Sequence, residues 1–190
     1  MSLDLPTCVR TTDPTILAAY AQRYTEISGH TTTAQDLDRS GQAVRVLYQG
    51  GRMIGGFVSR WEAPYRYLAI PPQGATLLTE LDLDDLVEST HNWLERDIST
   101  AARAMYYAAM GWEGLRSGKR YALGGTSEPR IRDLHMRYFP ELIYNGPGQD
   151  VDGKIYPDTW LYRGRISQMF LKLPEMMLRR SSRIRSTPPG

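Results

Sequence analysis

The sequence predicts a single α/β domain, in which helices flank a mixed central β-sheet. Two observations carry this prediction. The chain has 190 residues, of which 41% are hydrophobic and 23% charged, and this composition is that of an ordinary globular domain. Strand-like segments come first as a meander and then alternate with helical segments, an order typical of a sheet covered by helices.

The first helix is predicted from its start signals. Residues 7–10 fit a short strand, and Asp13 then offers an N-cap with Pro14 at the first helical position. Apolar residues at helical spacing extend this helix to Ser28. A polar loop follows, with a short helical turn expected at residues 34–37.

A β-hairpin is the clearest strand signal in the chain. Residues 43–48 and 53–58 are rich in β-forming side chains and are separated by a glycine-containing turn. Gly55 and Gly56 are unusual inside the second strand, because glycine weakens a strand unless backbone or ligand must approach closely. Residues 61–72 are aromatic and broken by proline, and we expect a third strand there.

The second half alternates strands and helices. We expect a strand at residues 86–94, and a helix capped by Ser99 or Thr100 and ended by Gly118. The remaining expected elements are a short strand at 120–123, a helix opened by Pro129 and stopped at Pro140, a late strand at 159–162 and an amphipathic helix between 166 and 185. The predicted organisation is a domain at 1–165 and an amphipathic, basic tail at 166–190.

Charge and cysteine content exclude several classes of function. The net charge of +2 is small for 190 residues and does not by itself indicate a nucleic-acid binder, and Cys8 is the only cysteine. A disulfide within the chain and a thiolate metal cluster are therefore excluded, which fits a reducing cytoplasm. No apolar run is long enough to span a bilayer, and the first residues do not match a signal peptide.

Metal and hydrolase motifs are also missing from the sequence. His30, His91 and His135 have no ligand-like spacing, so we predict no metal site. The chain contains neither a nucleophile elbow nor a Walker-type phosphate loop.

Three segments carry a resemblance to a known family. They are the hairpin at 44–56, the strand-to-helix stretch at 92–101, and residues 134–146, whose Tyr-Phe-Pro-Glu-Leu-Ile-Tyr run is similar to a "FY…LGF" helix end. Together with the order of elements, they resemble the GNAT superfamily of N-acyltransferases over residues 7–165. The resemblance implies a GNAT-like sheet, and transfer of an acyl group from a thioester to a small amine acceptor.

In that superfamily the turn after the central strand reads Arg/Gln-x-x-Gly-x-Gly/Ala and binds the pyrophosphate of coenzyme A. Free amides at a helix N-terminus explain such binding. Arg96 and Ala101 fit the pattern, whereas Ser99 replaces the first glycine and Asp97 adds a negative charge. The donor-binding residues implied by the resemblance are Trp93, Leu94, Arg96, Ser99, Thr100, Ala101, Ala102 and Arg103.

Because Ser99 and Asp97 differ from the family pattern, two kinds of thioester remain possible as the donor. Either acyl-CoA binds through modified contacts, or the donor is acyl-phosphopantetheine on an acyl carrier protein, as the resemblance to acyl-homoserine lactone synthases and N-acyl amino acid synthases implies. The donor is a co-substrate in both cases, and no tightly bound cofactor is expected. An acidic carrier protein would be attracted by the arginines of the tail, among them Arg179 and Arg183.

The catalytic candidates are Glu88, His91 and Tyr138. The resemblance suggests Glu88 as general base and Tyr138 as the proton donor to the leaving thiolate, with Tyr144 as fallback. His91 is a base candidate because the ordinary pKa of histidine suits proton transfer near neutrality. The alternatives are a Glu88–arginine pair, a hydrogen-bonded His91 and a core tyrosine. Strict period-two alternation would put Glu88 and His91 on opposite faces.

Two further segments have two interpretations each. Residues 105–107 fit either an acyl-binding wall or ordinary helix packing, and residues 124–127 fit either a phosphate loop or a plain strand-to-helix turn. Two other functions stay open: a tRNA-dependent aminoacyl transferase that uses the basic residues, and a non-catalytic module that binds a partner protein.

Overall fold

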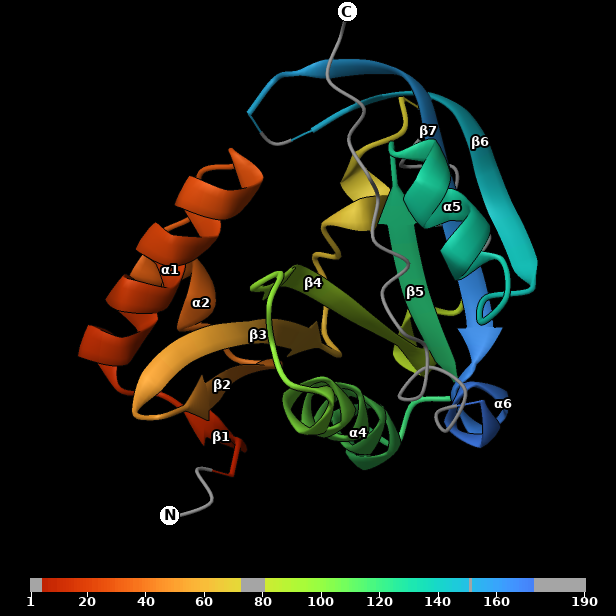
Figure 1. The fold of residues 1–190 in the computed structure, drawn as a ribbon. Coiled ribbons are helices and arrows are strands. Elements are labelled where there is room, and N and C mark those ends of the chain that lie inside the picture. Colours follow the sequence, from red (N-terminus) through yellow and green to blue (C-terminus); the bar gives the residue numbers. More distant parts are fainter. Residues whose placement is uncertain (1–4, 73–80, 151, 173–190) are drawn as a thin grey trace, which may run out of the picture.

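The computed structural model describes residues 5–72, 81–150 and 152–172. Its centre is a seven-stranded sheet in the order β1-β2-β3-β4-β5-β7-β6 (Figure 1). The strands are β1 Thr7–Thr11, β2 Gln42–Gln49, β3 Arg52–Arg60, β4 Leu86–Leu94, β5 Tyr121–Thr126, β6 Glu141–Gln149 and β7 Ile155–Arg165. The helices are α1 Pro14–Ser28, α2 Ala34–Leu37, η1 Tyr67–Ala69, η2 Leu83–Asp85, α4 Thr100–Arg116, α5 Pro129–His135 and α6 Ile166–Leu171.

The sheet is mixed, as predicted. β4 and β5 run parallel, and every other neighbouring pair is antiparallel. A parallel pair needs a crossover connection, which α4 supplies. The α/β prediction is confirmed.

The predicted helix starts are also observed. Asp13 caps α1 by accepting hydrogen bonds from the amides of Thr15 (2.8 Å) and Ile16 (3.4 Å). The helix ends at Ser28, where Gly29 adopts the left-handed conformation that glycine tolerates best. Ser99 caps α4 through a 3.1 Å bond from the amide of Ala102.

Helices cover the two faces of the β1–β4 half of the sheet. On one face α1 and α2 bury a cluster that includes Leu17, Tyr20 and Trp93, and on the other α4 packs Ala102 and Tyr106 over the strands. A third cluster fills the space between η1 and the β5–β7 half. None of the described helices combines the length and the apolar character that crossing a membrane requires.

A buried ion pair fixes α4 to the sheet. Arg45 on β2 donates from Nε to Glu113 on α4 at 2.9 Å, and its Nη2 also contacts that carboxylate. The Arg45 side chain is 14% exposed and the Glu113 side chain 3%, so neither charge could be removed alone without leaving the other uncompensated.

The two glycines of β3 are required for close packing. A Cβ added to Gly55 would lie 2.5 Å from the side chain of Leu94, and one added to Gly56 would lie 2.4 Å from the Tyr20 ring. Close approach therefore explains these glycines, as expected, and the approaching groups are protein side chains.

Two predicted segments need correction, and a third is described only in part. Residues 61–72 form no strand and contain only η1, because Pro64, Pro71 and Pro72 cannot donate to a regular ladder. Residues 141–149, for which no strand was predicted, form the edge strand β6. Ile166–Leu171 is α6, and Ile166 is buried; the rest of the predicted tail, residues 173–190, lies outside the described residues.

Candidate active site

The central feature of the site is a fork between β4 and β5. Their ladder joins Leu86 to Tyr121, Val87 to Ala122 and Glu88 to Leu123. Beyond Glu88, β4 continues along β3, while β5 continues along β7. The strands therefore diverge, and an opening forms within the sheet itself.

A β-bulge at His91 shapes one arm of the fork. Thr90 pairs with Val58 and Trp93 with Gly56, so two residues of β4 stand opposite the single residue between those partners. His91 has φ 51°, a conformation that costs a non-glycine residue energy. The Tyr20 hydroxyl donates a 2.7 Å hydrogen bond to the His91 carbonyl and so stabilises the bulge from α1.

The bulge corrects the expectation that Glu88 and His91 face opposite ways. Both contact Arg66: its amide donates to Glu88 Oε1 at 2.7 Å, and its Nη1 lies 2.9 Å from His91 Nε2. The two candidates thus belong to one site. Alternation fails here because the extra residue of the bulge resets the period of the strand.

Glu88 is fully buried and holds a loop in place. Its second oxygen accepts a 3.0 Å hydrogen bond from the amide of Tyr67, and Arg60 Nη1 lies 3.7 Å from Oε1. Burial raises the pKa of Glu88, while the two amides and Arg60 act in the opposite direction. With both oxygens occupied as acceptors, this carboxylate anchors the start of η1 to the apex of the fork.

His91 is held as a neutral imidazole. Burial, together with the charges of Arg66 and Arg60, lowers the pKa of His91 to about 3. Arg66 can only donate, so Nε2 is the acceptor and the proton resides on Nδ1, 3.0 Å from the Thr90 hydroxyl. A base with so low a pKa accepts protons weakly at neutrality.

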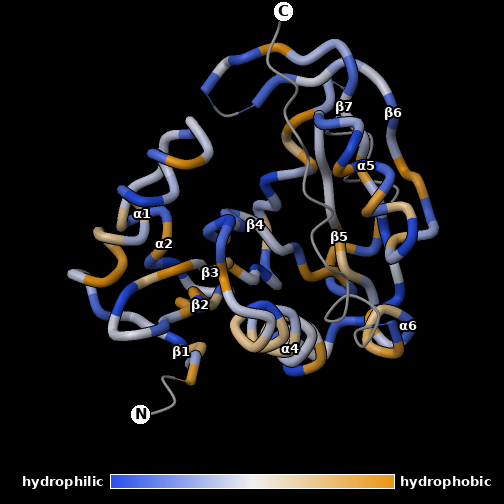
Figure 2. The backbone as a smooth tube through the Cα atoms, in the orientation of Figure 1, coloured by the Kyte–Doolittle hydropathy of each residue, from blue (hydrophilic) through white to orange (hydrophobic). Residues whose placement is uncertain are grey.

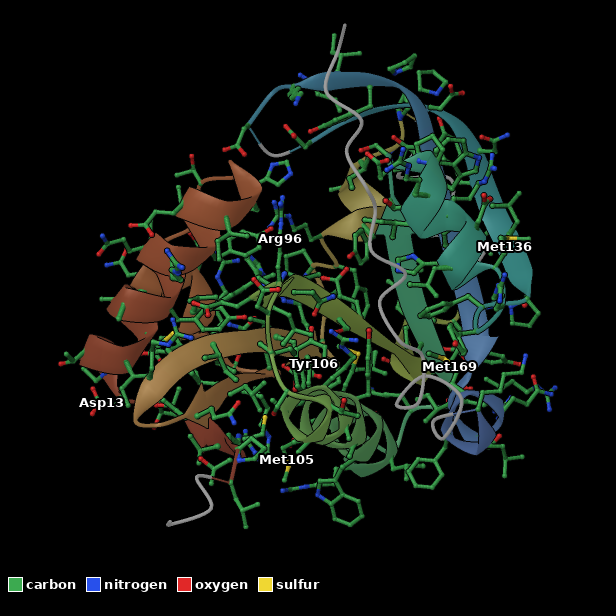
Figure 3. The ribbon with its side chains drawn as sticks, viewed as in Figure 1. Asp13, Arg96, Met105, Tyr106, Met136 and Met169 are labelled. Atoms are coloured by element: carbon green, nitrogen blue, oxygen red, sulfur yellow. The ribbon has the colours of Figure 1, made fainter. Side chains whose placement is uncertain are left out.

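An apolar hollow, the apex cavity, lies on the α4 face of the fork. It has a volume of about 80 Å³ and reaches Ser89 on β4 and Leu123 on β5. Its walls include Tyr107 and Met110 of α4 and Met169 and Phe170 at α6. Figure 2 shows α6 as largely hydrophobic, and Figure 3 places Met169 on the α6 side of this face.

Residues 105–107, which fitted either an acyl-binding wall or ordinary helix packing, differ from one another in the structure. Tyr106 is core, 4% exposed, whereas Met105 is 39% exposed. Figure 3 shows Tyr106 on the sheet side of α4 and Met105 on the opposite side. Tyr107 alone of the three lines the apex cavity.

A second hollow, with more polar groups in its walls than the apex cavity, lies at the open end of the fork, and we call it the mouth groove. Its volume is about 380 Å³, and its walls include Thr90 on β4 and Gly125 on β5, the former next in sequence to Ser89 of the apex cavity. Arg66, Tyr67, Ser127 and Tyr156 contribute to its walls. Three residues of the 124–127 stretch weighed as a phosphate loop, Gly125, Thr126 and Ser127, thus belong to the wall of this groove.

The predicted donor-binding residues divide into core and surface. Trp93 is buried against Tyr20, with ring centroids 5.9 Å apart, and Ala102 is also buried. Leu94 is half-buried against the α4 cluster. Arg96, Ser99, Thr100 and Ala101 are exposed around the start of α4, and Arg103 is half-buried one turn further on. Figure 3 shows Arg96 on the loop that follows β4.

The start of α4 can still receive an anion. The Ala102 amide donates to Ser99 Oγ, and the Arg103 amide donates to the Ser99 carbonyl. In this first turn, the amides of Thr100 and Ala101 precede the first hydrogen bond of the helix and can therefore donate to a ligand. The helix dipole favours negative charge there, and Arg96 adds a positive one.

The predicted tyrosines are not among the described residues that line either hollow. Tyr138 is 3% exposed, and neither hollow includes it among the described residues that form its walls. The Tyr144 hydroxyl donates to the carbonyl of Pro147 within β6. Their proposed part in proton transfer stays a prediction.

One cluster of possible metal ligands closes the far end of the mouth groove. His30 Nδ1 lies 3.3 Å from both Asp150 Oδ2 and Asp152 Oδ2, where the β6–β7 hairpin arches toward the end of α1 (Figure 1). Asp150 already accepts from the amides of Asp152 and Lys154 and from the Tyr156 hydroxyl. These contacts make the cluster a polar link between α1 and the hairpin.

Sequence reasoning missed Arg66, Tyr67 and Tyr20. Each acts through a contact distant in sequence: Arg66 and Tyr67 through Glu88, and Tyr20 through His91. The available signal was an arginine within an aromatic, proline-broken segment, which was assigned to a strand.

Solved structures share this architecture. The N-acyl amino acid synthase FeeM from uncultured soil microbes superposes with a TM-score of 0.61 at 12% identity, covering 86% of this chain and 92% of that one. The chain has the GNAT fold. The yncA protein of Salmonella typhimurium, solved with its cofactor acetyl-CoA, matches at TM-score 0.54 and 16% identity over 85% and 94% of the two chains.

The GNAT fold recurs in a third match, the AHL synthase LasI, at TM-score 0.56 and 11% identity over 85% of this chain and 89% of that one. No family model matches the sequence, and neither does any curated protein in a sequence search. The superpositions establish the GNAT fold and confirm the expected architecture. Because the sequence identities are so low, they do not assign a donor or an acceptor.

Proposed function

We propose that this protein is an N-acyltransferase that moves an acyl group from a thioester to an amine at the β4–β5 fork. The observation that supports it best is the pair of hollows at neighbouring positions of the fork in a GNAT fold. A thioester has an apolar acyl chain and a polar arm, and the two hollows differ in the same way. The single cysteine fits a cytoplasmic setting for this reaction.

The reaction joins three groups at one carbon. The neutral amine nitrogen attacks the thioester carbonyl carbon, the C–N bond forms and the C–S bond breaks. The amine loses one proton and the leaving thiolate gains one, so atoms and charge balance. In this proposal the acyl chain occupies the apex cavity and the amine approaches from the mouth groove, while Arg96 and the Thr100 and Ala101 amides meet the donor's phosphate.

The residues of the fork serve this reaction mainly by orientation. Glu88 positions the backbone of Arg66 and Tyr67, and His91 is neutral with its Nε2 engaged by Arg66. Holding amine and thioester together in the correct geometry can supply a large part of the rate enhancement. We retain Glu88 and His91 as a proton path through water and Tyr138 as the thiolate's proton donor, each open to test by substitution.

Calorimetric titration tests the proposal. Acetyl-CoA, decanoyl-CoA, decanoyl-phosphopantetheine and a decanoylated acyl carrier protein are titrated in turn, and the first three separate the contribution of the nucleotide from that of the arm. We expect at least one thioester to bind, with Arg96→Gln weakening the affinity about tenfold through loss of one charged contact.

Arg116→Gln is the matched control, because Arg116 is exposed on the last turn of the same helix. We expect it to leave the affinity unchanged. Failure of every thioester to bind would contradict the acyltransferase proposal, and equal effects of the two substitutions would remove Arg96 from the donor site.

A further inference from the structure

The histidine and two aspartates at the far end of the mouth groove come from distant parts of the chain. His30 follows α1, whereas Asp150 and Asp152 lie in the turn between β6 and β7, and His30 and Asp152 are 122 residues apart in the sequence. The arch of the β6–β7 hairpin brings them together (Figure 1). His30 and Asp150 are half-buried in the groove wall and Asp152 is exposed, so a dissolved ion can reach them.

The distances within this cluster are those expected around a single ion. His30 Nδ1 lies 3.3 Å from Asp150 Oδ2 and 3.3 Å from Asp152 Oδ2, and the three atoms all lie within 4.8 Å of one another. A charge-assisted hydrogen bond is shorter, about 2.8 Å. Two ligand atoms that bind one zinc ion at about 2.1 Å with tetrahedral geometry are about 3.4 Å apart. The two contacts of His30 thus match two edges of a tetrahedron around zinc.

Hydrogen bonding alone satisfies the cluster poorly. His30 Nδ1 carries at most one hydrogen, so it can donate fully to only one of the two carboxylates. Among the described residues, no lysine or arginine lies within 4.0 Å of either aspartate, so two carboxylates face one imidazole. A divalent cation would balance both carboxylates and would accept the lone pair of a neutral imidazole.

Neighbouring groups orient the two carboxylates. The amides of Asp152 and Lys154 donate to Asp150 Oδ1 at 3.0 and 2.9 Å. The Tyr156 hydroxyl donates to Oδ2 at 3.0 Å, which leaves the second lone pair of that oxygen for an ion. Asp152 Oδ2 accepts from the Thr31 amide at 3.3 Å. Such hydrogen bonds hold ligating carboxylates in place and raise the affinity for a metal.

The chemistry of the ligand atoms selects the class of ion. One imidazole nitrogen and two carboxylate oxygens form a mixed set that suits zinc and neighbouring transition metals, whereas Mg²⁺ and Ca²⁺ prefer oxygen ligands. Three protein ligands leave one position of a tetrahedral ion open to water or to a ligand in the groove.

From this geometry we propose that His30, Asp150 and Asp152 bind one divalent transition-metal ion of the zinc class. The ion joins the end of α1 to the β6–β7 hairpin across the far end of the mouth groove. Its binding involves neither a thioester nor an amine, so the inference goes beyond the proposed function and is tested independently of it. The spacing of the histidines in the sequence could not show this site, because two of its ligands are aspartates on a distant hairpin.

Calorimetric titration of Zn²⁺ into the full-length, untagged and chelator-treated protein tests the proposal. We expect saturable binding of one ion per chain, with Mg²⁺ at the same concentration failing to compete. His30→Gln should weaken the affinity at least about a hundredfold. Asp152→Asn should weaken it by more than about tenfold, and Tyr156→Phe, which loses the hydrogen bond to a ligating oxygen, by about tenfold.

Asp158→Asn is the matched control, because Asp158 is exposed on β7 of the same hairpin and lies outside the groove wall. It should leave the affinity unchanged. Co²⁺ offers a second readout that needs no turnover: its visible absorption should appear with the wild type and be absent with His30→Gln. Failure of the wild type to bind Zn²⁺ or Co²⁺ saturably, or binding that His30→Gln and Asp152→Asn leave intact, would overturn the proposal. Neither result bears on the thioester titration, which tests the proposed function.

Discussion

The apex cavity and the mouth groove lie at neighbouring positions of strands β4 and β5 and differ in size and in the chemistry of their walls. Ser89 and Leu123 belong to the cavity, whereas Thr90 and Gly125 belong to the groove. The cavity is walled by apolar side chains of α4 and α6, and the groove by hydroxyls, histidines and Arg66. Diverging strands thus give one sheet two chemically distinct compartments within a few residues.

Glu88 stands at the boundary of the two compartments, and its removal should have the largest effect. Glu88→Gln leaves Arg60 without its counter-charge and turns an amide nitrogen toward backbone donors. We expect the free energy of unfolding to fall by about 3–5 kcal/mol in denaturant titration. Glu141→Gln, which breaks an ion pair with Arg163 at a carboxylate 48% exposed, should cost about 1 kcal/mol or less. Equal losses would contradict the anchoring role of Glu88.

Filling the apex cavity should change the preference among acyl donors and leave the preference among acceptors unchanged. Met110→Trp introduces bulk into the cavity wall, and exclusion of about three methylene groups at ~0.8 kcal/mol each corresponds to about a 50-fold loss. We expect kcat/KM for decanoyl-CoA to fall by that factor relative to acetyl-CoA, with the preference between acceptors unchanged. Met105→Trp, on the solvent side of α4, is the control. A change in chain-length preference caused by both variants would argue against the cavity.

Acid should lower the free energy of unfolding through the two buried histidines of the mouth groove. The folded-state pKa values of about 3 for His91 and about 4 for His135 lie below the unfolded value of 6.5. The unfolded state therefore binds more protons below pH 6.5, and stability is lost as the pH falls from there toward 4. We expect each histidine to account for about 2 kcal/mol between pH 7 and pH 5.

Chemical denaturation of the wild type and His135→Gln at pH 7, 6 and 5 measures this loss. The variant should lose less stability over the range, since one of the two protons is no longer linked to unfolding. Parallel curves would show that His135 is not held neutral by burial.

The smallest effect is expected from the bulge. Tyr20→Phe removes the hydroxyl that bonds the His91 carbonyl, and this should lower the free energy of unfolding by about 1–2 kcal/mol. Tyr156→Phe loses a hydroxyl contact at the groove rim and should cost about 0.5 kcal/mol. If Tyr20→Phe is neutral in both stability and turnover, the bulge is maintained without help from α1.

The sequence predicted elements that local signals determine. The cap at Asp13, the hairpin around Gly50, and the full extent of β4 are all as expected, because caps, turns and β-rich runs are encoded within a few residues. Strand β6 was missed because Gly146, Pro147 and Gly148 disfavour a strand, and only its place at the sheet edge makes them tolerable.

The candidate site was harder to predict, since it depends on contacts between distant segments. Glu88 and His91 were identified as candidates, but their shared side depends on a bulge set by pairing with β3 and by Tyr20. Arg66 carries no local motif, and its place in the groove follows from Glu88, 22 residues away.

The measurement that tests the central claim most directly is amide formation with a panel of decanoyl and acetyl thioesters and a panel of amines, for the wild type, Met110→Trp and Arg66→Gln. The account predicts that Met110→Trp changes only the preference among donors and Arg66→Gln mainly the preference among acceptors. A panel in which both variants change both preferences alike, or in which no thioester is consumed, would contradict the division of the fork into a donor side and an acceptor side.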